Sequence, residues 1–367
     1  MSAAARSVHV FLPGDVDDVT LPSGGNTYDR RVCQGLAAAG RPVHEVAVGG
    51  DWPTPGADAR AELTRALASL ADGAVVLMDG LVACGVPDVV VPQARRLRLA
   101  VLVHLPLAAE TGIAPALAEE LDAAERATLH AATAVLATSP WAGRRLIGHH
   151  GLDPDRVHVV PPGTDPAPLA PGSDGASRLL CVAALTPRKG QDLIVRALGS
   201  LVDLPWTCEF VGSPHRSPAY VTRLREQIAA LGLEDRVRLA GPRTGERLAA
   251  SYAAADLVVL ASRGETYGMV VTEALARGIP VLATAVDAVP ETLGHAPDGR
   301  VPGLLTPPED PVALADALRR WLGEPGLRQR IKRSACDRRD MLDGWDVTSR
   351  RLADVLERLR RQSWPAT

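Results

Sequence analysis

The sequence lacks any run of about 18 consecutive apolar residues, the length that a membrane-spanning helix needs. The segment from Met1 to Gly14 holds one arginine and a short apolar stretch, too little for a secretory signal peptide. The five cysteines lie far apart without a CxxC pair, so they indicate buried thiols rather than a disulfide framework. We therefore expect a cytoplasmic protein without a transmembrane segment, and we do not favour peripheral contact with a membrane.

An excess of either charge is also missing. The 40 basic and 43 acidic residues are scattered along the chain and give a formal net charge of -3. No global field would then attract a polyanion, so we expect no nucleic-acid partner. Lysine is nearly absent, since only Lys189 and Lys332 occur, and this bias towards arginine, with abundant alanine, indicates a GC-rich bacterial genome. A lysine in a predicted loop, such as Lys189, is therefore harder to dismiss as ordinary surface charge.

What the sequence does contain is a regular alternation of short β-branched runs and alanine- and leucine-rich helical stretches, which is typical of βαβ units around a parallel sheet. The first-half strands are expected at Val8 to Leu12, Val43 to Val48, Ala74 to Met78, Arg98 to His104, Ala134 to Thr138 and Val157 to Val160. The helices between them are expected at Thr27 to Ala39, Asp58 to Leu70, Pro115 to Ala131 and Trp141 to His149.

A segment rich in proline, glycine and aspartate, from Pro161 to Gly175, has the composition of a linker, and the alternation restarts after it. The length of 367 residues also favours two cores. The sequence thus predicts an α/β protein of two doubly wound Rossmann-like domains, 1–165 and 176–344, facing each other across a cleft. A C-terminal helix in 345–367 is expected to cross back to the first domain.

Open α/β sheets bind ligands at the carboxyl ends of their strands, so candidate residues are expected in the strand-to-helix loops. The segment from Glu265 to Glu273 leaves the apolar strand Leu257 to Ser262 and enters a helix. Free N–H groups at such a helix start suit a diphosphate. The two carboxylates, at most ~12 Å apart along a helix, could accept hydrogen bonds from sugar and ribose hydroxyls. Alternatively, Glu265 is a helix-start carboxylate and Glu273 a solvated helix residue.

Three further loops hold candidate residues. Arg188 and Lys189 follow the first strand of the second domain, where cations can neutralise a diphosphate leaving group, or can simply decorate a turn. Gly24 and Gly25 form a two-glycine turn that lets the backbone approach a phosphate. His104 ends an apolar strand, where the alternative is a satisfied core histidine.

The segment SRGETYGMVVTEALARGIPVLAT resembles the E-x7-E region of the retaining family-4 glycosyltransferases (group 1), which have the GT-B fold. The resemblance implies that Glu265 contacts the donor sugar and Glu273 the ribose. It also implies that the backbone of Gly268 to Val270, with Thr266 and Tyr267 beside it, binds the phosphates.

The resemblance extends to the other loops. It implies that Gly24 and Gly25 form the glycine loop against the donor phosphate, and that His104 sits under the donor sugar. Lys189 matches the lysine of a GRL-x-x-x-KG pattern, whereas Ala184 stands where the family usually has an arginine. We expect Arg188 to substitute for that arginine.

The expected reaction is retaining transfer of a sugar from a nucleotide diphosphate donor, most readily a UDP- or GDP-sugar, to a hydroxyl of a small soluble acceptor. The stretch Pro13 to Arg30 holds no histidine that could serve as an inverting base. Without a GxGxxG motif or a metal-ligand cluster in the sequence, we expect neither a cofactor nor a metal. A sugar-nucleotide 2-epimerase and a non-catalytic nucleotide-sugar-binding protein remain alternatives.

Overall fold

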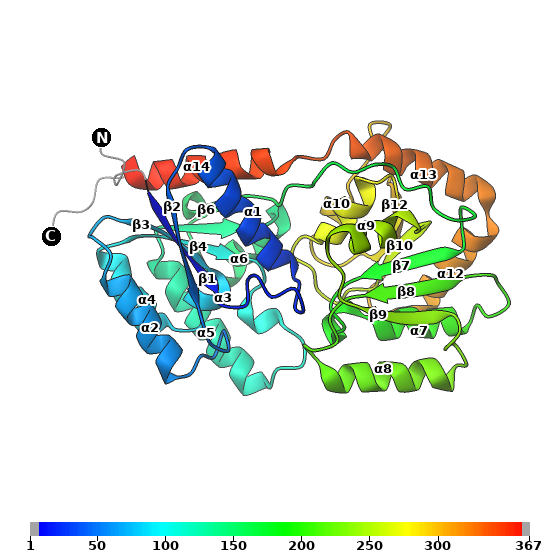
Figure 1. Cartoon of the computed structure of the whole chain (residues 1–367), viewed down its shortest axis with the longest axis horizontal. Helices are drawn as coiled ribbons and strands as arrows, with labels where there is room; N and C mark the ends of the chain where they lie inside the picture. Colours follow the sequence, from blue (N-terminus) through cyan, green and yellow to red (C-terminus); the bar gives the residue numbers. More distant parts are fainter. Residues whose placement is uncertain (1–6, 362–367) are drawn as a thin grey trace. The chain divides into compact units, whose positions relative to one another are not determined.

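The computed structural model describes residues 7–361, so the outer ends of the ranges 1–165 and 345–367, and part of the leader expectation for Met1 to Gly14, lie outside the described residues. The chain divides into two compact units (Figure 1). The first unit comprises Met1–Asp17, Gly24–Gly163 and Trp345–Thr367, and the second comprises Thr164–Gly344 together with the short stretch Asp18–Ser23.

The first unit is a six-stranded parallel sheet in the order β2-β1-β3-β4-β5-β6. Its strands are β1 (Val8–Pro13), β2 (Val43–Val48), β3 (Val75–Asp79), β4 (Arg98–Val103), β5 (Ala134–Ala137) and β6 (Val157–Val159). Its longer helices are α1 (Gly24–Ala38), α2 (Ala57–Ala68), α5 (Pro115–Ala131), α6 (Pro140–His150) and α14 (Trp345–Arg361), with short α3 (Gly80–Ala83) and α4 (Pro87–Val90) between β3 and β4.

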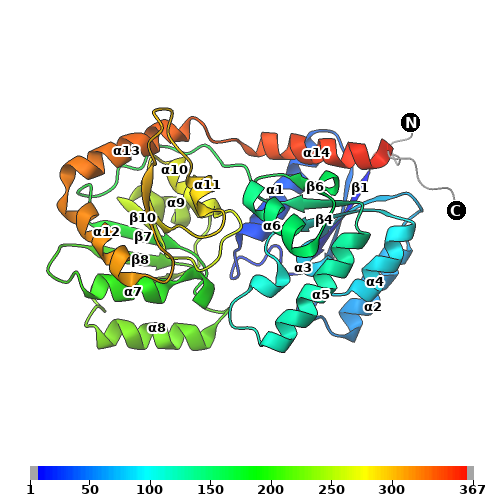
Figure 2. The ribbon, with the colours of Figure 1, turned by 180° about the vertical axis from the view of Figure 1, so that it is seen from behind.

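Alternation along the strands of this sheet builds two apolar layers. Phe11 faces a core shared with α2 to α6, whereas Val10 and Leu12 face α1 and α14. Figure 2 shows α2, α4 and α5 together on one side of this sheet. The C-terminal helix α14 thus completes the core of the first unit, where Leu352 and its neighbours are buried.

The second unit repeats the architecture with the strand order β12-β11-β10-β7-β8-β9, all parallel. Its strands are β7 (Arg178–Val182), β8 (Thr207–Val211), β9 (Val237–Gly241), β10 (Leu257–Leu260), β11 (Val281–Thr284) and β12 (Gly303–Thr306). Its helices are α7 (Gln191–Gly199), α8 (Pro218–Ala230), α9 (Gly245–Ala253), α10 (Met269–Leu275), α11 (Val289–Leu293), α12 (Pro311–Gly323) and α13 (Pro325–Arg339). Helices α7, α8 and α12 cover one face, and α9, α10, α11 and α13 cover the other.

The two doubly wound sheets confirm the expected fold class. Each order reverses direction at one place, between β1 and β3 in the first sheet and between β7 and β10 in the second. The crevice outside the carboxyl ends of such a strand pair is where open α/β sheets bind ligands. Ligand-binding residues are therefore expected in the loops after β1, β3, β7 and β10.

Some local expectations were wrong. Helix α1 begins at Gly24 rather than Thr27, so Gly24 and Gly25 are its first helical residues and not a loop before it. The buried side chains of Tyr28, Val32 and Leu36 hold this helix against the sheet and outweigh the low helix propensity of glycine. Cys336 is only half-buried, although the other four cysteines are buried thiols as expected and all five are free. Among the described residues, no helix combines the length and the apolar character that crossing a bilayer requires.

Candidate functional site

The first group of predicted residues lies at the switch between β7 and β10 in the second unit. A single 3-10 turn, η5 (Pro187–Lys189), follows β7 and holds both predicted cations. Glu265 follows β10, beyond Arg263 and Gly264. Because β7 and β10 are hydrogen-bonded neighbours, their loops meet at one edge of the sheet. The cations and the carboxylate are therefore delivered to the same place.

Lys189 and Glu265 form a close ion pair at this edge. The Nζ atom of Lys189 lies 2.5 Å from Oε2 of Glu265, and the side chains are only 17% and 13% exposed. Burial would raise the pKa of Glu265, but the Lys189 ammonium and the Arg188 guanidinium outweigh it and hold the pKa below its ordinary value. Glu265 is therefore a carboxylate at neutral pH, and its second oxygen is able to accept a hydrogen bond.

Hydrogen bonds to main-chain groups fix the loops of this site to one another. Nη1 of Arg188 donates to the carbonyl of Gly264 at 3.1 Å, and the amide of Arg263 donates to the carbonyl of Arg188 at 2.7 Å. The amide of Glu265 donates to Oδ2 of Asp287 at 2.9 Å. The loops after β7, β10 and β11 thus act as one framework, which holds the Lys189–Glu265 pair in position.

The tight approach of these loops depends on Gly190. This residue has φ = +63°, and a Cβ added there would lie 1.9 Å from the carbonyl oxygen of Ala261. Such a separation is far below van der Waals contact, so only glycine permits the backbone of the η5 turn to reach the end of β10. The position of Lys189 follows directly from this contact.

The predicted phosphate-binding residues come next along the chain. Thr266, Tyr267 and Gly268 lead into α10, and Met269 and Val270 are its first two residues. All five are half-buried. Gly268 is the residue before the helix, with φ = +87°, and has no side chain that could cap the amides of Met269 and Val270. The amide of Val271 donates to the carbonyl of Gly268 at 2.8 Å.

Glu273 lies further along α10, apart from the ion pair. Its Oε2 accepts a hydrogen bond of 2.7 Å from the hydroxyl of Tyr252, and the guanidinium of Arg277 lies over the Tyr252 ring at 4.5 Å. Burial raises the pKa of Glu273 despite the opposing effects of Tyr252 and Arg277. The alternative in which Glu273 is a freely solvated helix residue is therefore wrong.

The second group lies in the first unit, at the switch between β1 and β3. His104 follows β4, and its Nε2 lies 2.9 Å from Oδ1 of Asp29 and 3.6 Å from Oδ2 of Asp79. A Cβ added at Gly25 would lie 3.2 Å from Cδ2 of His104, so α1 starts close against the imidazole. Gly24 is exposed at the first position of the same helix. The structure thus brings Gly25 and His104 together, and it does so around a buried carboxylate pair.

The carboxylates determine the charge of His104. Burial would lower its pKa, but Asp29 in particular outweighs burial and raises the pKa to about 9. Burial and the neighbouring Asp29 raise the pKa of Asp79 well above its ordinary value. At neutral pH His104 is therefore an imidazolium, a hydrogen-bond donor rather than a base. The contact with Asp29 also fits the alternative of a histidine that is satisfied within the core of the first unit.

Asp29 and Asp79 were missed in the sequence, although a signal for each was present. Asp79 ends the apolar strand Val75–Asp79, and Asp29 lies four residues after Gly25, one helical turn further on. An acid at the carboxyl end of a buried strand is such a signal, although a lone one also has ordinary structural explanations. The predicted residues lie in both units, and the role of each one remains a prediction.

The chain matches known glycosyltransferases in sequence. Residues 171–338 match the profile of the group 1 glycosyl transferases, and residues 83–168 match that of glycosyltransferase family 4. The D-inositol 3-phosphate glycosyltransferase of Kineococcus radiotolerans is 36% identical over 257 residues, which are 64% of this chain and 59% of that relative. The chain therefore spans less than two-thirds of the length of this relative.

Solved structures agree on the fold. Sucrose-phosphate synthase from Thermosynechococcus elongatus matches with a TM-score of 0.80 at 22% identity, covering 96% of this chain and 99% of that chain. Anabaena HepE in complex with UDP and glucose matches with a TM-score of 0.74 at 20% identity, covering 96% and 99%. From the two profiles, which run almost continuously from residue 83 to residue 338, and from the two doubly wound sheets, the chain belongs to the group 1, family 4 glycosyltransferases of GT-B fold.

Proposed function

We propose that the protein transfers a sugar from a nucleotide diphosphate donor to a hydroxyl of a small acceptor, with retention of the anomeric configuration. The observation that carries this proposal is the Lys189–Glu265 ion pair, with Arg188 beside it, at the β7–β10 switch. The loop after β7 supplies positive charge, and the loop after β10 supplies an ionised carboxylate. A diphosphate and the sugar attached to it need these two kinds of partner side by side.

The cations serve the leaving group. As the glycosidic bond breaks, negative charge grows on the diphosphate, and preorganised positive charge stabilises that state more than the ground state. Lys189 and Arg188 provide it in a half-buried place where water screens the interaction weakly. In a front-face reaction the leaving diphosphate oxygen takes the proton of the acceptor hydroxyl, so no protein base is required. Catalysis then consists mainly of positioning and charge stabilisation.

The carboxylates orient the donor. Ionised Glu265 accepts hydrogen bonds from sugar hydroxyls, and Glu273, already hydrogen-bonded to Tyr252, accepts from the ribose. The backbone from Thr266 to Val270 lies between these two residues in the chain and binds the phosphates. His104, as an imidazolium, donates a hydrogen bond to the sugar, while Gly24 and Gly25 allow close approach of the phosphate.

The names of related proteins support a more specific proposal for the donor and the acceptor. HepE was solved with UDP and glucose, which favours a UDP-sugar over a GDP-sugar as donor. Several relatives are named D-inositol 3-phosphate glycosyltransferase, which favours an inositol phosphate as the small acceptor. We propose that the transfer reaction needs neither a cofactor nor a metal.

A thermal-shift panel of UDP- and GDP-sugars, followed by transfer assays, tests the proposal. A ligand that binds only the folded protein raises the melting temperature, so a UDP-sugar is expected to give the largest rise. Incubation of that donor with inositol 3-phosphate is then expected to yield a glycoside with the donor's anomeric configuration. An epimer formed from the donor alone would favour a 2-epimerase, and binding without transfer to any acceptor would favour a binding protein. Either result overturns the proposal.

A further inference from the structure

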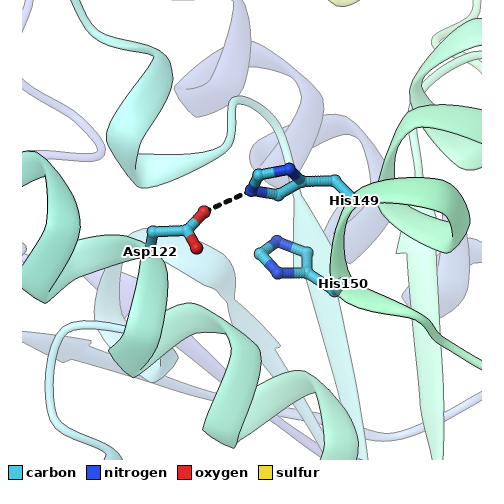
Figure 3. Close-up of side chains that lie close together, drawn as sticks. All are labelled: Asp122, His149 and His150. Carbon is cyan, nitrogen blue, oxygen red and sulfur yellow. Dashed lines mark hydrogen bonds and ion pairs between the residues drawn. The ribbon is translucent and has the colours of Figure 1, made fainter.

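A second cluster of ligand-type side chains lies in the first unit, apart from the residues already described. Asp122 is on α5, and His149 and His150 are the last two residues of α6 (Figure 3). Each offers one nitrogen or carboxylate oxygen, and these atoms lie within 4.8 Å of one another. Figure 3 shows the Asp122 carboxylate and the two imidazole rings gathered in one place. Two imidazoles and a carboxylate at this separation form a ligand set for a transition metal.

The cluster is held by a contact between two of its own members and by one buried carboxylate behind it. Nε2 of His149 lies 2.5 Å from Oδ1 of Asp122, and Nε2 of His150 lies 3.1 Å from Oε2 of the buried Glu125. Nδ1 of His150 is buried and has no hydrogen-bond partner among the residues that the structure describes. A histidine whose one ring nitrogen donates to a carboxylate while the other keeps a lone pair is the arrangement that metal-binding histidines adopt.

The surrounding charges permit a cation. The carbonyl end of α6 carries partial negative charge, and its last side chains are the two histidines. Arg126 is the nearest fixed positive charge, and its two terminal nitrogens donate to the carbonyls of His149 and His150 at 3.0 Å each. It approaches Oδ2 of Asp122 at 3.6 Å, whereas Oδ1 faces His149. Oδ1 of Asp122, which lies next to the His149 imidazole, is thus not the oxygen that contacts Arg126.

We propose that Asp122, His149 and His150 bind one divalent transition-metal ion, with Zn²⁺ the best match. Zinc accepts nitrogen and carboxylate ligands in a tetrahedral arrangement, whereas Mg²⁺ and Ca²⁺ prefer oxygen alone. Asp122 and His149 are 26% and 35% exposed, which leaves room for water at the fourth position. Binding through Nε2 of His149 replaces its hydrogen bond to Asp122, leaves the one imidazole proton on Nδ1, and widens the contact between the two ligand atoms to ~3.3 Å, the spacing of tetrahedral zinc ligands.

The ion would have a structural role. The cluster lies on α5 and α6, whereas Gly25 is in α1 and His104 follows β4. Glu125, behind His150, also accepts a hydrogen bond of 3.3 Å from the amide of Leu107 in the loop after β4. A metal here ties α5 to the end of α6 and stabilises the folded first unit. It takes no part in sugar transfer, and activity is expected to survive its removal.

The test uses the whole chain, stripped with a chelator and then dialysed against ZnCl₂, with bound zinc measured by elemental analysis. We expect saturation at one zinc per chain, a rise in melting temperature, and the visible absorption of tetrahedral cobalt when Co²⁺ replaces zinc. Asp122→Asn and His149→Gln, both at partly exposed positions, are expected to weaken binding at least tenfold. Glu125→Gln, which keeps the shape but not the charge behind His150, is expected to weaken it about 10- to 100-fold.

Two control variants make the result decisive. His295→Gln changes an exposed histidine of the second unit and is expected to leave zinc binding unchanged. His104→Gln removes a ligand from the other group of three such residues, Asp29, Asp79 and His104, and is also expected to leave it unchanged. Zinc binding that does not saturate overturns the proposal. So does binding that is kept at full strength in both Asp122→Asn and His149→Gln, whatever His104→Gln does, with circular dichroism confirming that each variant is folded.

Discussion

Lys189 and Glu265 are 76 positions apart in the sequence, yet their charged atoms lie 2.5 Å apart in the structure. They meet because β7 and β10 are neighbours in the sheet although two strands separate them in the chain. The contact is thus a product of the doubly wound topology. It also means that Lys189 helps to keep Glu265 ionised, because the ammonium lowers the pKa of that carboxyl group.

We first predict that Lys189→Ala lowers kcat/KM by about 10²- to 10³-fold, because a preorganised charge at the leaving group is lost. Glu265→Gln, which keeps the shape and removes the charge, is expected to lower kcat by a similar order. Lys332→Ala, which removes the other lysine of the chain from an exposed position, serves as the control and should retain full activity. Steady-state kinetics check these outcomes, and near-normal transfer by both site variants would show that the site is misassigned.

A second prediction concerns Arg188, which we propose as the substitute for the arginine that Ala184 replaces. Arg188→Ala is expected to lower kcat by about tenfold or more while the protein stays folded, because a second cation near the diphosphate is removed. Arg223→Ala on the exposed side of α8 is the matched control. If Arg188→Ala and Arg223→Ala show equal rates, Lys189 alone supplies the positive charge and Arg188 is a turn residue.

The third prediction is a pH dependence of stability that originates at His104. Its pKa is raised to about 9 by Asp29, from an ordinary value near 6.5. A raised folded-state pKa adds stability that is complete below the unfolded pKa and is lost as pH rises through the folded pKa. Thermal melts should therefore show stability falling between about pH 6.5 and pH 9, and His104→Gln should remove this part of the fall.

The matched control for that experiment is His295→Gln, at an exposed histidine. It should melt with the same pH dependence as the unmodified protein. His9 and His158 have lowered pKa values because of burial, so they affect stability below this window rather than within it. A His104→Gln variant with an undiminished slope between pH 6.5 and pH 9 would mean that the imidazole is not held charged by Asp29.

The sequence was sufficient to predict the loops that hold charge, and insufficient for what surrounds them. Lys189 and Glu265 were recognisable because each follows an apolar strand, and the strand period marks where loops begin. The buried partners Asp29 and Asp79 were not recognised, since a lone aspartate in a helix or at a strand end has many ordinary explanations. Only the packing of α1 against β3 and β4 brings them to His104.

The start of α1 shows that local sequence is also insufficient to predict a helix boundary. Two glycines in succession predict a turn, because glycine is a poor helix former. The structure nevertheless begins the helix at Gly24, since the buried stripe of Tyr28, Val32 and Leu36 fixes the helix axis. Tertiary packing thus decided a boundary that propensity alone placed three residues later.

A fourth prediction separates binding from chemistry at Glu273. Glu273→Gln is expected to raise KM for the donor about tenfold with little change in kcat, because the ribose lies away from the reacting bond. The amide oxygen of glutamine can still accept the hydrogen bond from Tyr252, so the fold should be kept. Tyr252→Phe is the companion variant, and it should affect KM in the same direction but less. A fall in kcat with unchanged KM would place Glu273 at the reacting centre instead.

The last prediction concerns Gly190, which allows η5 to approach β10. In Gly190→Ala the new methyl group would overlap the carbonyl of Ala261, so the turn must move and carry Lys189 with it. The backbone strain at positive φ alone costs about 1–3 kcal/mol, and the overlap adds to it. Gly232→Ala is the matched control, because Gly232 has a similar φ of +65° but open space around its Cβ position. Urea unfolding should show a clearly larger loss for Gly190→Ala, and transfer should fall in that variant alone. Equal losses in the two variants would mean that the η5 turn yields without cost, and that the position of Lys189 does not depend on this contact.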